Sequence, residues 1–194
     1  MIRETRVGIQ QKARVCQGDV FRNIECIENV VQQGGILEVS KIIFPLVLVL
    51  TQDCDLEQDY RVRWSRRKPA NQDKALVSVL VAPLYNEEHV YLGQHLSDLK
   101  MNMEPINKGK TPGENLRANN NPRYHFLKFP ERIQIVRSVI DFKHYFSVHV
   151  EYLKKIKRAH FLCQLADLDR ENVSQRFASF LSRIGLPDVP KKKR

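Results

Sequence analysis

The sequence predicts an α+β fold: a small β-barrel core with inserted loops and a C-terminal amphipathic helix. Short apolar runs separated by polar segments with Gly or Pro predict many short strands. One stripe of apolar residues near the C-terminus is the clearest helical pattern in the chain. Many strands followed by one terminal helix are typical of an α+β domain built on a small barrel.

The two most apolar segments predict buried strands. Residues 42–50 contain the unbroken run from Pro45 to Leu50, and residues 75–82 form a second run that ends before Pro83. Continuous apolar runs of this length are typical of strands buried on both faces. Other extended segments are expected at 15–27, 36–39, 89–92, 124–129, 133–142, 146–150 and 159–165.

A helix is predicted over residues 170–184. Val173 and Phe177 begin its apolar stripe, Asp169 is a suitable N-cap, and Gly185 supplies a stop. A shorter helix is expected over 94–103, a loop at the Gly-Gly step of 32–35, and long polar loops over 57–74 and 104–122.

The length of 194 residues suits one domain with a proper core. We predict a single domain over residues 1–187, divided into a barrel core at 15–92 and an extension at 93–187. The basic end, 188–194, is predicted to be a disordered tail, although its last residues also resemble a nuclear-import peptide.

The composition excludes several classes of protein. No apolar run approaches the roughly 18 residues that span a bilayer, and the N-terminus lacks an apolar signal segment, so we expect a cytoplasmic protein with no membrane partner. The cysteines show no CxxC pair, which indicates free thiols and no zinc site. They are Cys16, Cys26, Cys54 and Cys163.

The net charge is +10, from 32 basic and 22 acidic residues. Four of the basic residues are the last four of the chain, so the rest carries +6 (28 minus 22). A basic balance favours acidic partners such as nucleic acid, but it is also common in proteins that bind none.

Three short landmarks, in order, resemble the MazF/PemK family of small SH3-like barrels. They are Gly18-Asp19-Val20, Pro45 opening the strand Leu46-Val47-Leu48-Val49-Leu50-Thr51, and Leu80-Val81-Ala82-Pro83. The match covers about residues 15–92, and the chain from Gln94 onward has no counterpart in that family. The resemblance implies an SH3-like barrel core.

The family is best known for toxins that cut single-stranded RNA, often as homodimers held by an antitoxin. Its catalytic pair is an Arg beside the first Pro and a Thr after the second. Here Phe44 replaces the Arg, and Leu84, Tyr85 and Asn86 stand where the Thr is expected. The resemblance therefore implies RNA binding in a toxin–antitoxin or phage-defence system, possible homodimers, and ribonuclease residues that are lost or relocated.

An alternative enzymatic site lies where the first buried strand ends. Asp53, Cys54 and Asp55 follow this strand directly, and His125 is a candidate base for a cysteine nucleophile. Alternate residues of a strand point to one side, so the two acids are also suited to hold Mg²⁺. The same residues fit an Asp-rich turn, and His125 equally fits a core histidine.

A cationic segment with one tryptophan follows at residues 61–68. Its candidate nucleic-acid-binding residues are Arg61, Arg63, Trp64, Arg66, Arg67 and Lys68. Cations neutralise phosphates and an exposed Trp stacks on bases, which favours single strands. A solvated loop with Trp64 folded onto the body fits the pattern too.

The remaining histidines give no ligand spacing. Asp141 and His144, with His149 and His160, show no i, i+4 pair and are interpreted as ordinary polar strand positions.

Three functions stay open: a nucleic-acid-binding barrel, an enzyme using the Asp53–Asp55 strand exit as a metal-assisted nuclease or Cys hydrolase, and a subunit that binds a protein partner.

Overall fold

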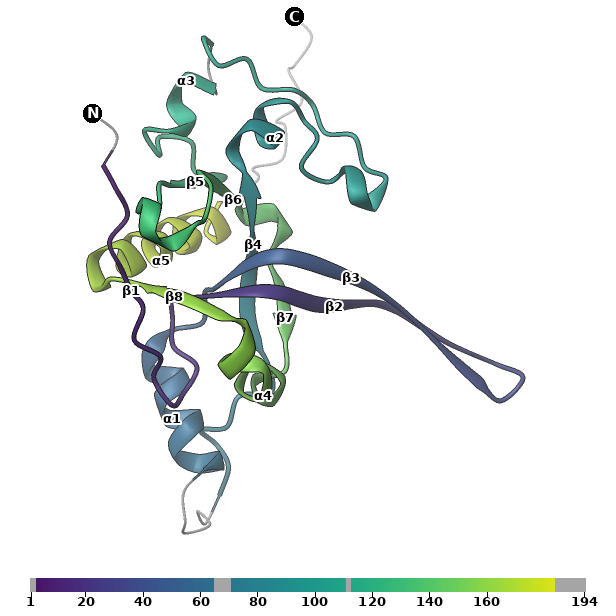
Figure 1. Cartoon of the computed structure of the whole chain (residues 1–194). Coiled ribbons are helices and arrows are strands. Elements are labelled where there is room, and N and C mark those ends of the chain that lie inside the picture. The colour runs from purple at the N-terminus through teal and green to yellow at the C-terminus, as the bar shows by residue number, and fades with distance from the viewer. Residues whose placement is uncertain (1–2, 65–70, 111–112, 184–194) are drawn as a thin grey trace, which may run out of the picture.

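The computed structural model describes residues 3–64, 71–110 and 113–183. The fold is α+β, with a curled antiparallel sheet (Figure 1). The strands are β1 (Val7–Gly8), β2 (Asp19–Gln33), β3 (Ile36–Val49), β4 (Val79–Asn86), β5 (Tyr124–Leu127), β6 (Ser138–Asp141), β7 (Phe146–Val148) and β8 (Phe161–Leu165). The helices are α1 (Asp53–Arg63), α2 (Glu87–Tyr91), α3 (Gly113–Leu116), α4 (Val150–His160) and α5 (Asp167–Leu181), with 3-10 turns η1 (Ser97–Leu99), η2 (Glu131–Ile133) and η3 (Phe142–His144).

The strands follow the order β1-β8-β2-β3-β4-β6-β5, with β7 also paired to β4. Strand β4 joins two parts of the sheet, because its first half pairs with β3 and β7 and its end, from Leu84, pairs with β6. Pro83, expected to end this strand, lies inside it where β4 changes partner. A proline is tolerated at such an interruption of the hydrogen-bond ladder.

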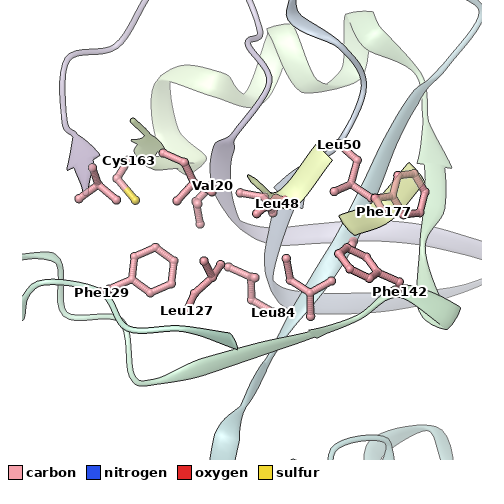
Figure 2. Packing of buried hydrophobic residues seen from close by; sticks show 14 residues of the cluster. Val20, Leu48, Leu50, Leu84, Leu127, Phe129, Phe142, Cys163 and Phe177 are labelled. Atoms are coloured by element: carbon pink, nitrogen blue, oxygen red, sulfur yellow. The ribbon is translucent and has the colours of Figure 1, made fainter. Parts of the chain in front are cut away.

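Of the predicted strand at 42–50, the residues from Val47 onward are buried and covered on both faces, whereas Ile43 and Pro45 are exposed. Val20 of β2 and Leu48 of β3 face a cluster that includes Phe177 of α5. The neighbouring residues Phe21 and Val47 face the opposite cluster, which includes side chains of α1 and α4. Figure 2 shows the α5 side, where Phe142 and Phe177 lie together with ring centroids 5.5 Å apart. Helices therefore cover both faces of the sheet.

Strands β2 and β3 continue beyond the body as a two-stranded arm (Figure 1). The predicted loop at 32–35 is its tip, a two-residue turn in which Gly34 and Gly35 both have positive φ. Two such residues are the requirement of a type I′ hairpin turn. The segments expected as separate strands at 36–39 and 42–50 are thus one strand, in which Pro45 lies opposite the distorted residue Asn23 (φ 53°).

Several local expectations were wrong. The polar segment at 57–74 begins as part of helix α1, and 89–92 belongs largely to helix α2. Only the turn η1 forms within the helix expected over 94–103. Helix α4 was not predicted at all. Helix α5 is confirmed, but it begins at Asp167, two residues before the expected N-cap. The C-terminal stop at Gly185 and the basic tail lie outside the described residues.

Candidate functional sites

The acids after the first buried strand lie in the first turn of a helix, not on a strand. Asp53 and Asp55 begin α1, where carboxylates are favoured by the positive end of the helix dipole. Residues two apart on a helix point to different sides, so the two carboxylates do not converge as the sequence suggested for Mg²⁺.

Asp53 is held in a network of ion pairs. Its carboxylate accepts hydrogen bonds from both terminal nitrogens of Arg14, at 2.8 and 2.6 Å, and from the backbone N–H of Gln17 at 3.1 Å. Arg170 of α5 lies 3.9 Å away. Burial raises the pKa of Asp53, but these donors outweigh it and hold the pKa below its usual range. The contacts fasten the start of α1 to the N-terminal segment and to α5.

Cys54 and Asp55 are exposed next to Asp53. The Cys54 Sγ lies 3.6 Å from both the Gln52 Oε1 and the Asp55 Oδ1 atoms. All four cysteines are free thiols, as expected. The structure therefore places Asp53, Cys54 and Asp55 next to one another in the first turn of α1, at the surface of the protein.

His125 lies elsewhere, buried on β5. Burial, reinforced by the charge of Arg176, lowers the pKa of His125 to about 3. Arg176 is near His125, and Arg170 faces Asp53. These two arginines are six residues apart on α5, so about 9 Å of helix axis separates them. No hydrogen bond or ion pair in the described residues joins His125 to Asp53, Cys54 or Asp55.

The cationic segment divides into two parts. Arg61, Arg63 and Trp64 lie at the C-terminal end of α1, while Arg66, Arg67 and Lys68 lie outside the described residues. Arg63 has a structural role, since its guanidinium binds Asp59 at 2.7 Å, Glu151 at 3.2 Å and the backbone carbonyl of Leu76. The side chain of Arg61 pairs with Glu57 but is 76% exposed.

A basic and aromatic surface lies between α1 and α4. Tyr60 and Trp64 stack with ring centroids 5.2 Å apart, and Trp64 is 39% exposed. The Lys154 Nζ lies 5.9 Å from the centre of the Tyr60 ring. Lys154, Lys155 and Arg158 follow one side of α4 at helical spacing and form no ion pair with any residue the structure describes. We call Tyr60, Trp64, Lys154, Lys155 and Arg158 the α1–α4 surface.

A second cluster combines two histidines and an aspartate. His95 precedes η1, Asp141 ends β6 and His144 ends η3, and one ligand atom of each lies within 4.8 Å of the others. The Asp141 carboxylate is fully buried and accepts hydrogen bonds from Arg123 and from the Lys143 backbone N–H. The sequence offered Asp141 and His144 at i, i+3, but His95 is 46 residues away, so no local spacing could add it.

The surroundings favour neutral imidazoles in this cluster. Burial lowers the pKa of His144 against the opposing charge of Asp141. Burial and then the neighbouring His144 lower the pKa of His95, although Asp141 and a loose contact with the His89 carbonyl act in the other direction. Neutral imidazole nitrogens are available as acceptors or as metal ligands.

A cavity of about 330 Å³ adjoins the histidine cluster. His95 and Tyr85 belong to its lining, and Tyr85 also contacts His144, with its hydroxyl 3.2 Å from the Nδ1 atom. Phe44 and the segment 84–86, where the family resemblance places its catalytic pair, line the same cavity. These residues thus converge in space, and His89 and His95 belong to the same lining.

No protein-family model matches the chain, and a search of curated proteins finds no match. Among the residues the structure describes, no helix is long and apolar enough to cross a membrane.

Proposed function

We propose that the protein binds single-stranded nucleic acid, in the first place RNA, through the α1–α4 surface. The observation that carries the proposal is the stacked pair of Tyr60 and Trp64 with Lys154 beside it. Lys155 and Arg158 follow on the same side of α4, and none of the three cations forms an ion pair with a described residue. Aromatic rings that stack on bases, next to cations that follow the backbone, are the common design of proteins that bind single strands.

The placement of the cations favours a ligand over a purely structural role. Like charges at i, i+3 and i, i+4 destabilise an isolated helix by about 0.2–0.5 kcal/mol per pair. Lys154 and Lys155 each form such a pair with Arg158, and Glu151, one turn before them, is already paired with Arg63 at 3.2 Å. A phosphate backbone would remove this repulsion.

Fluorescence anisotropy with a short labelled RNA tests the proposal directly. Wild type should bind single strands, and the affinity should fall steeply between about 50 and 200 mM salt. Replacing Lys154, Lys155 and Arg158 together by Ala should weaken binding on the order of 100-fold at 0.1 M salt, from three lost phosphate contacts.

A matched control removes three exposed cations elsewhere. Lys110, Arg137 and Lys143 lie outside α1 and α4, and their joint replacement by Ala changes the net charge by the same amount. The proposal requires near wild-type affinity in this variant. Equal losses in the two triple variants would mean that binding follows net charge alone and that the α1–α4 surface is not the site.

We infer an SH3-like barrel core of the MazF/PemK type and a cytoplasmic protein. The continuous antiparallel order β8-β2-β3-β4 and the curl of the sheet support the barrel. An experimentally determined structure, superposed on SH3-like barrels, tests this part.

A second candidate function, self-association, rests on the arm of β2 and β3. One face of the arm carries a row of aliphatic side chains that are 48–65% exposed. They are Ile27, Val30, Leu37, Val39 and Ile43. A two-stranded ribbon alone in water is marginally stable, so a covered face would stabilise it.

The charge of the arm disfavours nucleic acid as its partner. Between residues 23 and 44 it carries Glu25, Glu28 and Glu38 against Lys41, a net charge of −2. We propose a second copy of the chain as the partner, with two aliphatic faces stacked. Light scattering after gel filtration should give a dimer for wild type and a monomer for the double variant Leu37→Lys, Val39→Lys; a monomeric wild type at all concentrations contradicts it.

A further inference from the structure

We propose that His95, Asp141 and His144 bind one divalent transition metal ion, with Zn²⁺ the best match. Two imidazoles and one carboxylate are a ligand set suited to zinc and neighbouring transition metals, whereas Mg²⁺ and Ca²⁺ prefer oxygen ligands throughout. Three protein ligands with one further position open are typical of zinc sites that bind water or substrate.

The geometry is close to that of a bound site. Zinc bonds of about 2.0–2.1 Å place tetrahedral ligand atoms about 3.4 Å apart. The three ligand atoms here lie within 4.8 Å of one another, and the His144 Nδ1 is already 3.7 Å from the Asp141 Oδ2. To close the site, the ligand atoms would have to approach one another by at most about 1.4 Å (4.8 minus 3.4).

The two ring nitrogens of His95, Nδ1 and Nε2, lie in the cluster without a clear hydrogen-bond partner. Both of its ring nitrogens are buried, and neither makes a hydrogen bond of normal geometry with any described residue. Buried polar atoms in this condition are uncommon, and a bound ion is one of their ordinary explanations. The imidazole packs edge-on against Tyr85, with ring centroids 4.9 Å apart, and lies 6.0 Å from the ring of His144, which leaves its nitrogens beside the cluster.

Arg123 holds the carboxylate in place, as an outer-shell residue does. Its guanidinium binds both Asp141 oxygens, with the Nε atom shared between them, and with the Lys143 N–H the carboxylate accepts four contacts from three donor groups. A metal ion would take the place of the second, 3.0 Å contact of the Nε atom. Outer-shell hydrogen bonds of this kind orient metal ligands. Arg123 also brings a positive charge, so the competing interpretation is that Asp141 serves only as the partner of Arg123.

The site would face the cavity. His95 and Tyr85 line both the cluster and the cavity of about 330 Å³, and the Tyr85 hydroxyl is a further oxygen donor beside His144. Of the three ligands only His95 lines the cavity, so a molecule bound there would lie beside the metal on the His95 side. The inference is independent of nucleic-acid binding at the α1–α4 surface.

Isothermal titration calorimetry of the full chain, freed of metal by a chelator, tests the proposal with Zn²⁺, Co²⁺ and Mg²⁺ as probes. A Cys54→Ser background removes the exposed thiol, which is a competing zinc ligand. We expect one Zn²⁺ per chain, a visible Co²⁺ absorption band, no Mg²⁺ binding, and a melting temperature that rises with Zn²⁺.

His95→Gln and His144→Gln should each weaken Zn²⁺ binding at least 100-fold. His89→Gln, which changes a cavity-lining histidine outside the cluster, should leave it within about twofold. Histidine side-chain NMR of the wild type provides a readout that does not depend on variant folding: Zn²⁺ should shift the signals of His95 and His144 but not that of His125. Absence of stoichiometric binding, or equal affinity in all three variants, would overturn the proposal and leave Asp141 as the partner of Arg123.

Discussion

The two ends of helix α1 carry charged residues in very different surroundings. At the N-terminal end, Asp53 is bound by Arg14, by the Gln17 N–H and, at longer range, by Arg170. At the C-terminal end, Trp64 stacks on Tyr60 and remains partly exposed beside α4. The first end fastens three segments of the chain together, and the second leaves an aromatic pair partly exposed to solvent.

This difference shows how little a residue type says about its role without its neighbours. In the sequence, the acids at the N-terminal end are candidates for a site, because carboxylates bind metal ions and a thiol can act as a nucleophile. The structure adds that Asp53 already has partners for its charge. Lys154, Lys155 and Arg158 of α4, which the sequence did not single out, form no ion pair within the described part of the chain.

The largest expected effect is on RNA affinity and comes from the α4 cations next to the C-terminal end of α1. Reversing Lys154, Lys155 and Arg158 to Glu should reduce RNA affinity by more than 100-fold, because three attractive phosphate contacts become repulsive. Anisotropy at 0.1 M salt measures the change, and circular dichroism checks that α4 still forms. Retained affinity in a folded variant would place the nucleic-acid site elsewhere.

Trp64→Ala should weaken binding by about 5- to 150-fold, since stacking is worth about 1–3 kcal/mol per base. Trp64→Phe keeps a ring and should recover most of the affinity. Because the chain has a single tryptophan, its fluorescence in the wild type should be quenched by RNA but not by free phosphate. Unchanged fluorescence at saturating RNA would exclude Trp64 from the interface.

Asp53→Asn should act on stability and not on binding. Losing the charge that Arg14 and the Gln17 N–H bind should cost about 1–3 kcal/mol of the free energy of unfolding. Urea unfolding measures the loss, and RNA affinity should stay within about twofold. A large loss of affinity in a fully stable variant would move the functional site to this end of α1.

The pH dependence of that loss has a definite sign. The folded-state pKa of Asp53 lies below its unfolded value, so the stabilisation is present above the unfolded pKa of about 3.9 and disappears as the pH falls through the folded pKa. The difference between wild type and Asp53→Asn should therefore be constant near neutral pH and shrink in acid. A difference that grows in acid contradicts the assigned ion pair.

Cys54→Ser should have the smallest effect. The thiol is exposed, and its two contacts at 3.6 Å are long, so neither stability nor RNA affinity should change measurably. RNA incubated with wild type and variant, followed on denaturing gels, adds the enzymatic test. Cleavage by wild type that is lost in the variant would favour a Cys-dependent hydrolase over a binding protein.

Some of the fold could be predicted because its signals are local. The run from Pro45 to Leu50 is apolar at every position, and its part from Val47 onward is buried between two core clusters. The stripe that contains Val173 and Phe177 repeats at helical spacing, and α5 forms there. The Gly34-Gly35 step indicated a break, which is the hairpin turn.

The rest depended on contacts between distant segments. Helix α1 has no apolar stripe, with Leu56 its one buried apolar residue, and it is held at its start by Arg14, 39 residues before Asp53. Helix α4 does repeat Val150, Leu153 and Ile156 at intervals of three, a signal that could have been used. His95 meets Asp141 only through the folding of the chain, so no pattern in the sequence joins them.

The most direct test of the central claim is the salt dependence of RNA binding. The logarithm of the binding constant should fall linearly with the logarithm of salt concentration, with a slope of about −0.7 for each phosphate neutralised. Replacing Lys154, Lys155 and Arg158 by Ala should make this slope shallower by about 2, whereas the control triple variant at Lys110, Arg137 and Lys143 should keep the wild-type slope. Parallel lines for all three proteins, or no binding by wild type at low salt, would contradict the assignment of the α1–α4 surface to nucleic acid.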